Sequence, residues 1–190
     1  MARQIGLKDI HIAVLTSDNG TGAVYETPSK VERAISAKIS PKVNSDNIYS
    51  DDTVEDIITA FEGVDVEIEL NQLSLTSRAK LQGSSVVKGV LIESKDDLPP
   101  TIALGFKSKK NNGKYRYVWL LKGKFELATD EYDTEAEKPK AQSAKLKGKF
   151  YSRDFDGNYR FIADEDETGI DLTIISSWFT SVLTEPAATP

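Results

Sequence analysis

Hydrophobic and polar residues alternate with a period of two along much of the chain, and the clearest case is the stretch 101–127. Ile102, Leu104 and Phe106 recur at every second position before a polar segment, 109–113, interrupts the alternation. The alternation then resumes at Tyr115, Tyr117, Trp119 and Leu121. A period of two is typical of a half-buried strand, and the Asn-Gly pair in the interruption favours a tight turn. We therefore predict a β-hairpin here, as the spine of a β-sheet domain.

Shorter runs of the same alternation predict the other strands. They cover 7–16, 23–27, 31–43, 64–70, 86–93, 143–151 and 159–163. Clusters of Gly, Asp and Asn at 17–22 and 156–158 read as turns, so the strands on either side of each are predicted to form hairpins.

Two segments have the pattern of helices. The first, 72–83, is short and has Gly83 as its stop signal. The second begins at Asp171, a residue type that caps helix N-termini, and ends before Pro186. Its apolar stripe consists of Ile174, Ile175, Trp178, Phe179, Val182 and Leu183.

These elements predict a mainly β fold. About nine or ten strands with one short flanking helix and one C-terminal helix favour an antiparallel β-sandwich or partial barrel. We expect a single domain over 1–183, a flexible C-terminal tail over 184–190 and an exposed loop over 128–142.

Acidic residues dominate the segment 44–70, which holds nine of them and no lysine, arginine or histidine. Its first part, 44–56, lacks a period and reads as a long loop, followed by a short helical or extended piece at 54–61. In its second part an acid row, Asp65, Glu67 and Glu69, alternates with Val64, Val66, Ile68 and Leu70. Such a row is either an ordinary solvated sheet face or a surface that repels a polyanion.

Composition and charge narrow the function classes. The chain has 190 residues, a formal net charge of -6 and no cysteine. A general nucleic-acid binder, which needs a basic face, is therefore disfavoured, and disulfides, thiolate metal sites and a cysteine nucleophile are excluded. No apolar run approaches the roughly 18 residues of a membrane-spanning helix.

Motifs for catalysis or cofactor binding are weak. His11 is the only histidine and lies within a strand pattern, without partners for a catalytic site. The acidic residues around Asp154 and Asp156 faintly resemble a calcium loop, but the later ligands are missing, so a turn is the better interpretation. We expect no enzymatic activity, no cofactor and no metal.

Four blocks of sequence carry a resemblance to a known family. They are IGLKDI (5–10), IYSDD (48–52) with VEIEL (66–70), IALGFKSKKNNGKYRYVWLLKGKF (102–125), and ADED (163–166) followed by the IISSWF helix. In this order they resemble the major tail proteins of long, flexible-tailed bacteriophages of the siphovirus type. The block at 102–125 is the most specific, and the similarity spans nearly the whole chain.

The resemblance implies a structural virion protein that self-assembles into hexameric rings, which stack into the tail tube through which DNA is ejected. Its partners would be further copies of itself, the tail terminator, tape measure and distal tail proteins, and passing double-stranded DNA, with no membrane. It would be made and assembled in the bacterial host cytoplasm and reside in the virion tail.

Roles for particular residues follow from the resemblance. A loop over 41–62 would reach the next ring through Ile48, Tyr49, Ile57, Ile58 and Phe61. An acidic lumen would draw its charge from Asp51, Asp52, Asp65, Glu67 and Glu69. Lys145, Lys147 and Lys149 would then face outward or pair across subunits. At the tip of the central hairpin, Lys109 and Lys110 would contact a neighbouring subunit.

Two alternatives stay open. The chain could be a monomeric β-sandwich module that binds a carbohydrate or a protein. It could also be a ring protein of a related contractile-tail or secretion tube. Self-assembly of the purified chain would distinguish a tube subunit from a monomeric binding module.

Overall fold

The computed structural model describes residues 2–50, 53–128, 130 and 143–185. In chain order the elements are β1 (Gln4–Asn19), β2 (Gly22–Tyr25), β3 (Ser29–Lys30), β4 (Ala34–Ser50), β5 (Thr53–Leu70), α1 (Leu75–Gln82), β6 (Ser85–Val87), β7 (Val90–Ile92), β8 (Ile102–Lys110), β9 (Tyr115–Phe125), β10 (Ala144–Tyr151), β11 (Arg160–Asp164) and α2 (Leu172–Ser177). The prediction of a mainly β, antiparallel fold with two helices is confirmed.

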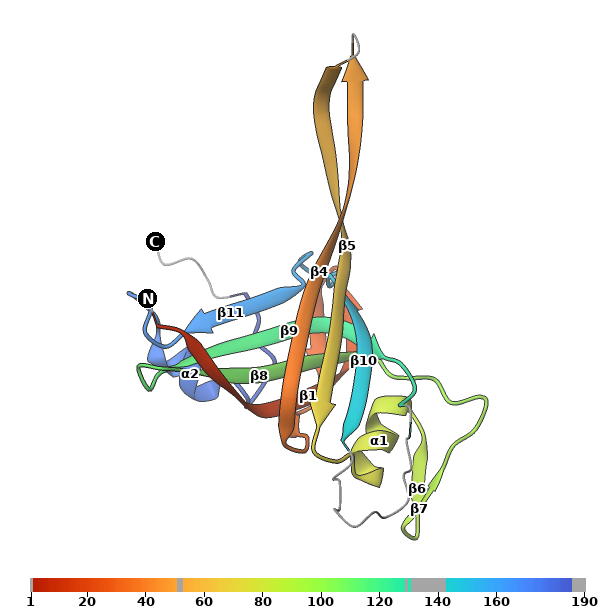
Figure 1. Cartoon of the computed structure of the whole chain (residues 1–190). Helices are drawn as coiled ribbons and strands as arrows, with labels where there is room; N and C mark the ends of the chain where they lie inside the picture. The colour runs from red at the N-terminus through yellow and green to blue at the C-terminus, as the bar shows by residue number, and fades with distance from the viewer. Residues whose placement is uncertain (1, 51–52, 129, 131–142, 186–190) are drawn as a thin grey trace, which may run out of the picture.

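Most strands belong to one strongly bent sheet. Its order is β2-β1-β8-β9-β10-β5-β4, with β11 paired to β9 and β3 paired to β1. The sheet bends so that β4, β5 and β10 lie across β1, β8 and β9, which gives a sandwich-like body (Figure 1). The small pair β6–β7 forms a separate two-stranded sheet beside α1.

Two apolar clusters stabilise the body. The larger one is formed by side chains of β1, β5, β8, β9 and β10, including Ile12, Val66, Leu104, Leu120 and Phe150. The smaller one covers the opposite face of β1, β8 and β9 with residues that follow α2, and its members are Ala13, Ala103, Trp119, Leu121, Trp178 and Val182. The indole N–H of Trp119 donates to the carbonyl oxygen of Trp178 at 2.9 Å.

The central hairpin formed by β8 and β9 is confirmed, and both of its faces are buried. Leu104 on β8 lies opposite Leu120 on β9, and both belong to the larger cluster. Trp119 projects from the other face into the smaller cluster. The side chains on the two faces of this hairpin therefore pack in two different apolar clusters.

Three details of the predicted strands and helices are wrong. The segment 86–93 is not one strand but the hairpin β6–β7, because Lys88 and Gly89 have φ angles of 50° and 83° and make a tight turn. Strand β11 pairs with β9 and not with β10, so the strands at 143–151 and 159–163 are not a hairpin. Helix α2 ends at Ser177 and not near Pro186, and the chain continues as a turn.

The predicted loop over 41–62 is also wrong, because residues 41–50 and 53–62 belong to two long strands. The ladder between β4 and β5 continues from Ala34 opposite Leu70 to Ser50 opposite Thr53. The predicted exposed loop over 128–142 and the tail over 184–190 lie largely outside the described residues.

Candidate functional site

A two-stranded arm projects from the body. We define the arm as residues 43–50 and 53–61, the part of β4 and β5 beyond the sandwich (Figure 1). Within the body, β5 is flanked by β4 and β10, but the ladder with β10 ends at Val64. The arm is therefore a ribbon of two strands, a type of structure that is only marginally stable in water without further packing.

A bulge marks the point at which the arm leaves the body. Lys42 pairs with Gly63, whereas Val43 pairs with Phe61, so Glu62 is an extra residue on β5. Gly63 has a φ angle of 147°, and a Cβ atom there would lie 2.9 Å from the carbonyl oxygen of Phe150. A bulge bends the strand that carries it, and here glycine permits the bend.

The arm exposes apolar side chains on both faces. The ladder places Val43, Phe61 and Ile57 on one face, whereas Ile58 lies on the other. Their exposed fractions are 58% for Val43, 41% for Phe61, 55% for Ile57 and 56% for Ile58. Side chains that are apolar and half exposed along a projecting ribbon are typical of a contact surface for another molecule.

The base of the arm is fixed to the body by an aromatic contact. The ring of Phe61 stacks on that of Tyr159, with centroids 4.5 Å apart and an angle of 28° between the planes. Tyr159 precedes β11, so the contact connects the arm to the C-terminal part of the sandwich. Phe61 therefore has a role within the chain as well as an exposed surface.

All five predicted stacking residues lie on the arm, and Ile57, Ile58 and Phe61 are those with exposed side chains in the described part. Ile48 lies in β4 opposite Asp56, and Tyr49 lies opposite Val54. The structural description of Ile48 and Tyr49 extends only to the backbone. Val43 was missed by the sequence analysis, because a single valine after Pro41 gives no recognisable pattern.

The acid row has lysines on both sides of it. The row of β10 lies directly opposite the acid row and consists of Lys145, Lys147 and Lys149. On β4, Lys38 lies opposite Glu67, and the Lys42 ammonium is 2.5 Å from the Asp65 carboxylate. On β9, Lys124 lies opposite Lys149. Directly paired residues of antiparallel strands share a face, so these six lysines lie on the same face as the three carboxylates of the acid row.

The expectation that these lysines face away from an acidic lumen formed by the acid row is therefore wrong, whereas their pairing across subunits stays a prediction. Lys145, Lys147 and Lys149 do not face away from the acid row but lie beside it. The described outer face of β4, β5 and β10 is mixed in charge, with lysines in excess, and is not an acidic surface. Asp51 and Asp52, the other predicted sources of lumen charge, lie outside the described residues.

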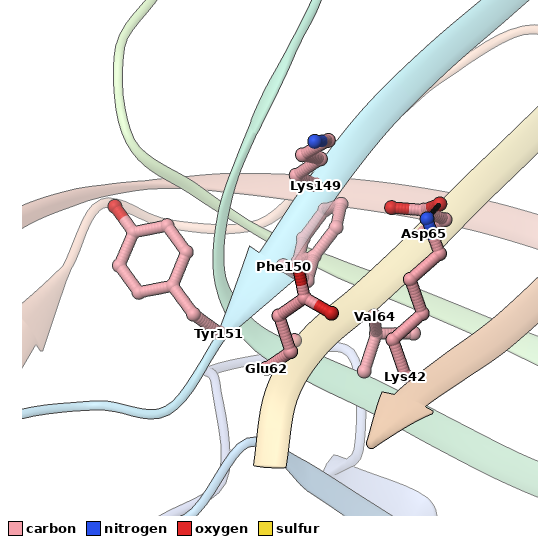
Figure 2. A pocket seen from close by; sticks show the side chains of 8 residues that line it. Lys42, Glu62, Val64, Asp65, Lys149, Phe150 and Tyr151 are labelled. Carbon is pink, nitrogen blue, oxygen red and sulfur yellow. Dashed lines mark ion pairs between the residues drawn. The ribbon is translucent and has the colours of Figure 1, made fainter. Parts of the chain in front are cut away.

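An open hollow lies between β5 and β10 on this face (Figure 2). It has a volume of about 260 Å³, and Lys42, Asp65 and Lys149 are among its lining residues. The hydrogen-bonded ion pair with Lys42 lowers the pKa of the Asp65 carboxyl and raises the pKa of the Lys42 ammonium. The ion pair of Lys42 and Asp65 in this hollow therefore stays charged at neutral pH.

The tip of the central hairpin is held by the ADED block at 163–166. Asp164 accepts two hydrogen bonds of 2.6 Å from the Arg116 guanidinium and lies 3.0 Å from the Lys110 ammonium. Glu165 accepts from the Lys114 ammonium and from the backbone N–H of Tyr115, both at 3.0 Å. Asp166 accepts from Lys110 and from the Asn112 amide. All three carboxylates therefore bind the hairpin tip.

The prediction that Lys110 contacts a neighbouring subunit is not supported by its position. Its side chain is only 6% exposed, because Asp164 and Asp166 enclose its ammonium group. Lys109 is half-buried, and its side chain has no ion pair to another described residue. Of the two predicted tip residues, Lys109 alone retains a group that can reach a neighbour.

Within residues 2–50, 53–128, 130 and 143–185, no helix has the length and apolar character needed to cross a membrane. The same part of the chain contains no group of three or more histidine and carboxylate side chains placed to hold a metal ion. Comparison with protein-family models and with curated proteins finds no match for the chain.

Proposed function

We propose that the chain is the repeating subunit of a tail tube of the kind found in long, flexible-tailed bacteriophages. The observation that carries the proposal is the arm, which projects from the body and exposes Ile57 and Ile58. The arm lies within residues 41–62, the segment that the resemblance assigns to the contact with the next ring. The proposed role of the body is to hold the arm in a fixed orientation.

The apolar residues of the arm supply the driving force for stacking. Complete burial of an isoleucine contributes about 1.5–3 kcal/mol, and the exposed halves of Ile57 and Ile58 would together contribute roughly 2 kcal/mol. A hexameric ring would present this contribution at each of its arms, which favours stacking even when a single contact is weak.

An acidic lumen formed by the acid row is not part of the proposed tube. Neighbouring lysines on the same face offset its charge, so like-charge repulsion from this face cannot be the reason that DNA slides. Passage of DNA through the tube is proposed without a role for Asp65, Glu67 or Glu69.

The test is self-assembly of the purified chain, measured by sedimentation and negative-stain electron microscopy over a range of protein and salt concentrations. We expect rings and stacked tubes from the unchanged chain. The double variant Ile57→Ser/Ile58→Ser should form few or no tubes, because the arm loses its apolar surface.

The matched control is Thr59→Ser, which lies on the arm and removes much less apolar surface. It should assemble like the unchanged chain. A chain that remains monomeric under every condition would contradict the proposal and would favour a monomeric binding module instead. Tubes formed equally well by the double variant would show that the arm does not drive stacking.

A further inference from the structure

A second exposed apolar surface lies on the small sheet β6–β7. The register pairs Val87 with Val90 and Ser85 with Ile92, which places Val87, Val90 and Ile92 on one face. These three side chains are 50%, 62% and 50% exposed. We call them the receiving face.

The receiving face lies at the end of the molecule opposite the arm. In Figure 1 the arm points away from the body on one side, whereas β6, β7 and α1 lie on the other. The two exposed apolar surfaces are therefore far apart and cannot cover each other within one chain.

The sheet that carries the receiving face is fixed to the body by helix α1. Arg78 of α1 donates from Nε to Glu93, the residue after β7, at 3.0 Å. Its Nη1 also donates to both carboxylate oxygens of Asp130, at 2.7 and 2.6 Å. The bond to Glu93 joins α1 to the end of the small sheet, whereas the bonds to Asp130 join α1 to the segment after β9. A charged hydrogen bond of this kind favours a defined orientation of the small sheet on α1.

The arm is acidic, whereas one exposed lysine lies at the edge of the receiving face. The segment 43–62 contains acidic residues and no lysine, arginine or histidine, and Asp46 and Asp56 on the arm are exposed. Beside the receiving face, Lys88 is exposed at the turn of the hairpin, and its ammonium has no ion pair to another described residue. An acidic apolar ribbon therefore fits a receiving face that has a lysine at its edge.

We propose that the arm of one copy of this chain docks on the receiving face of the next copy. The proposal rests on the stacking described above and assigns the surface that accepts the arm. Two different, complementary surfaces at opposite ends of a molecule make a head-to-tail contact, which repeats without limit in one direction. This geometry produces a stack and not a closed pair.

Cysteine cross-linking tests the contact directly, because the natural chain contains no cysteine. The single variants Ile57→Cys and Val90→Cys are prepared with tags of different size, mixed and oxidised. A cross-linked dimer containing one copy of each variant is expected in the mixture. Each variant alone should give little cross-linking, as should Val90→Cys mixed with Ile162→Cys, whose replaced side chain is 46% exposed on β11.

A second variant, Val90→Asp, tests the consequence for assembly. It should reduce tube formation at least tenfold, while unfolding of the body, followed by tryptophan fluorescence, stays unchanged. One outcome would overturn this inference alone: the unchanged chain forms tubes, Val90→Asp forms them equally well, and the mixture gives no cross-link. The assignment of the receiving face would then be wrong, whereas the proposed tail-tube function would be supported. Cross-linking of Ile57→Cys to itself in place of Val90→Cys also overturns the inference. A natural chain that never assembles overturns both proposals.

Discussion

Replacement of Asp164 by asparagine should destabilise the fold by releasing the tip of the central hairpin. The Asp164 carboxylate binds the Arg116 guanidinium through two hydrogen bonds and the Lys110 ammonium at 3.0 Å. Asparagine has a similar shape but no charge. In the variant Asp164→Asn, Lys110 and Arg116 would lie close together with Asp166 as the remaining nearby carboxylate.

The size of the effect follows from the pKa of Asp164. Hydrogen bonds from Arg116 and Lys110 lower this pKa from 3.8 to about 2. At about 1.4 kcal/mol per unit, the shift corresponds to about 2 kcal/mol of stability for the ionised group. Because the carboxylate is partly in contact with solvent, screening reduces the expected loss to about 1–2 kcal/mol.

The sign of the pH dependence follows from the same shift. The unfolded chain binds a proton at Asp164 near pH 3.8, and the folded chain does so only near pH 2. The contribution of Asp164 is therefore complete above about pH 4 and is lost as the pH falls towards 2.

Urea unfolding measures this contribution. Trp119 and Trp178 are almost fully buried, so their fluorescence reports on the body. The free energy of unfolding of Asp164→Asn should be lower than that of the natural chain at pH 7. Between pH 5 and pH 2.5, the free energy of unfolding of Asp164→Asn should decrease less than that of the natural chain.

The control for this experiment is Glu167→Gln, which removes an exposed carboxylate from the same turn without breaking an ion pair to a described residue. It should behave like the natural chain. Equal free energies of unfolding for Asp164→Asn and the natural chain at pH 7, with equal losses on acidification, would refute the role assigned to Asp164.

Two further predictions concern the body and the base of the arm. The ring of His11 stacks on that of Phe179 with centroids 4.2 Å apart, and burial lowers the pKa of His11, so its NMR titration should have a midpoint below 6.5. The variant Phe179→Ala exposes the His11 ring and should raise this midpoint. An unchanged midpoint would contradict burial as the cause. Gly63→Ala should reduce the free energy of unfolding by about 1–3 kcal/mol, because alanine is strained at this φ angle and its Cβ meets the Phe150 carbonyl. Gly20→Ala, with no atom within 4 Å of the added Cβ, should change it little in the same urea titration, and equal effects of the two variants would show that the bulge is not strained.

The sequence was informative wherever one face of a strand is buried. Val64, Val66 and Ile68 point into the larger core and alternate with exposed or half-buried acids, so the period of two was visible. The cap of α2 was also predicted, and the Asp171 carboxylate accepts a 2.8 Å hydrogen bond from the backbone N–H of Thr173. In these places the local sequence and the tertiary packing require the same conformation.

The arm was missed because it has no buried face. Hydrophobic alternation arises when a strand packs on a core, and the residues described as exposed here, 44–47, 53 and 56, pack on none, so their sequence resembles a loop. The pairing of β4 with β5 is visible only in the structure. Val43 became a candidate contact residue only when the ladder placed it beside Phe61.

The neighbours and the burial of the charged residues also depended on tertiary structure. Along the chain, the acid row and Lys145, Lys147 and Lys149 are far apart, and nothing local indicates that β10 lies next to β5. The ADED block and the hairpin tip are separated in the same way, so the burial of Lys110 could not be predicted. The charge of a surface is a sum over neighbouring strands, and sequence order does not specify those neighbours.

The sequence by itself determined which segments alternate, where the central hairpin turns, and that the chain folds as a mainly β protein with two helices. The tertiary structure alone decided that both faces of the central hairpin are buried, that a paired arm leaves the body at Gly63, and that lysines flank the acid row. The physical reason is that a period of two records only whether a strand has a buried face. Strand order, sheet bending and the direction of a projecting ribbon come from contacts between residues far apart in the chain.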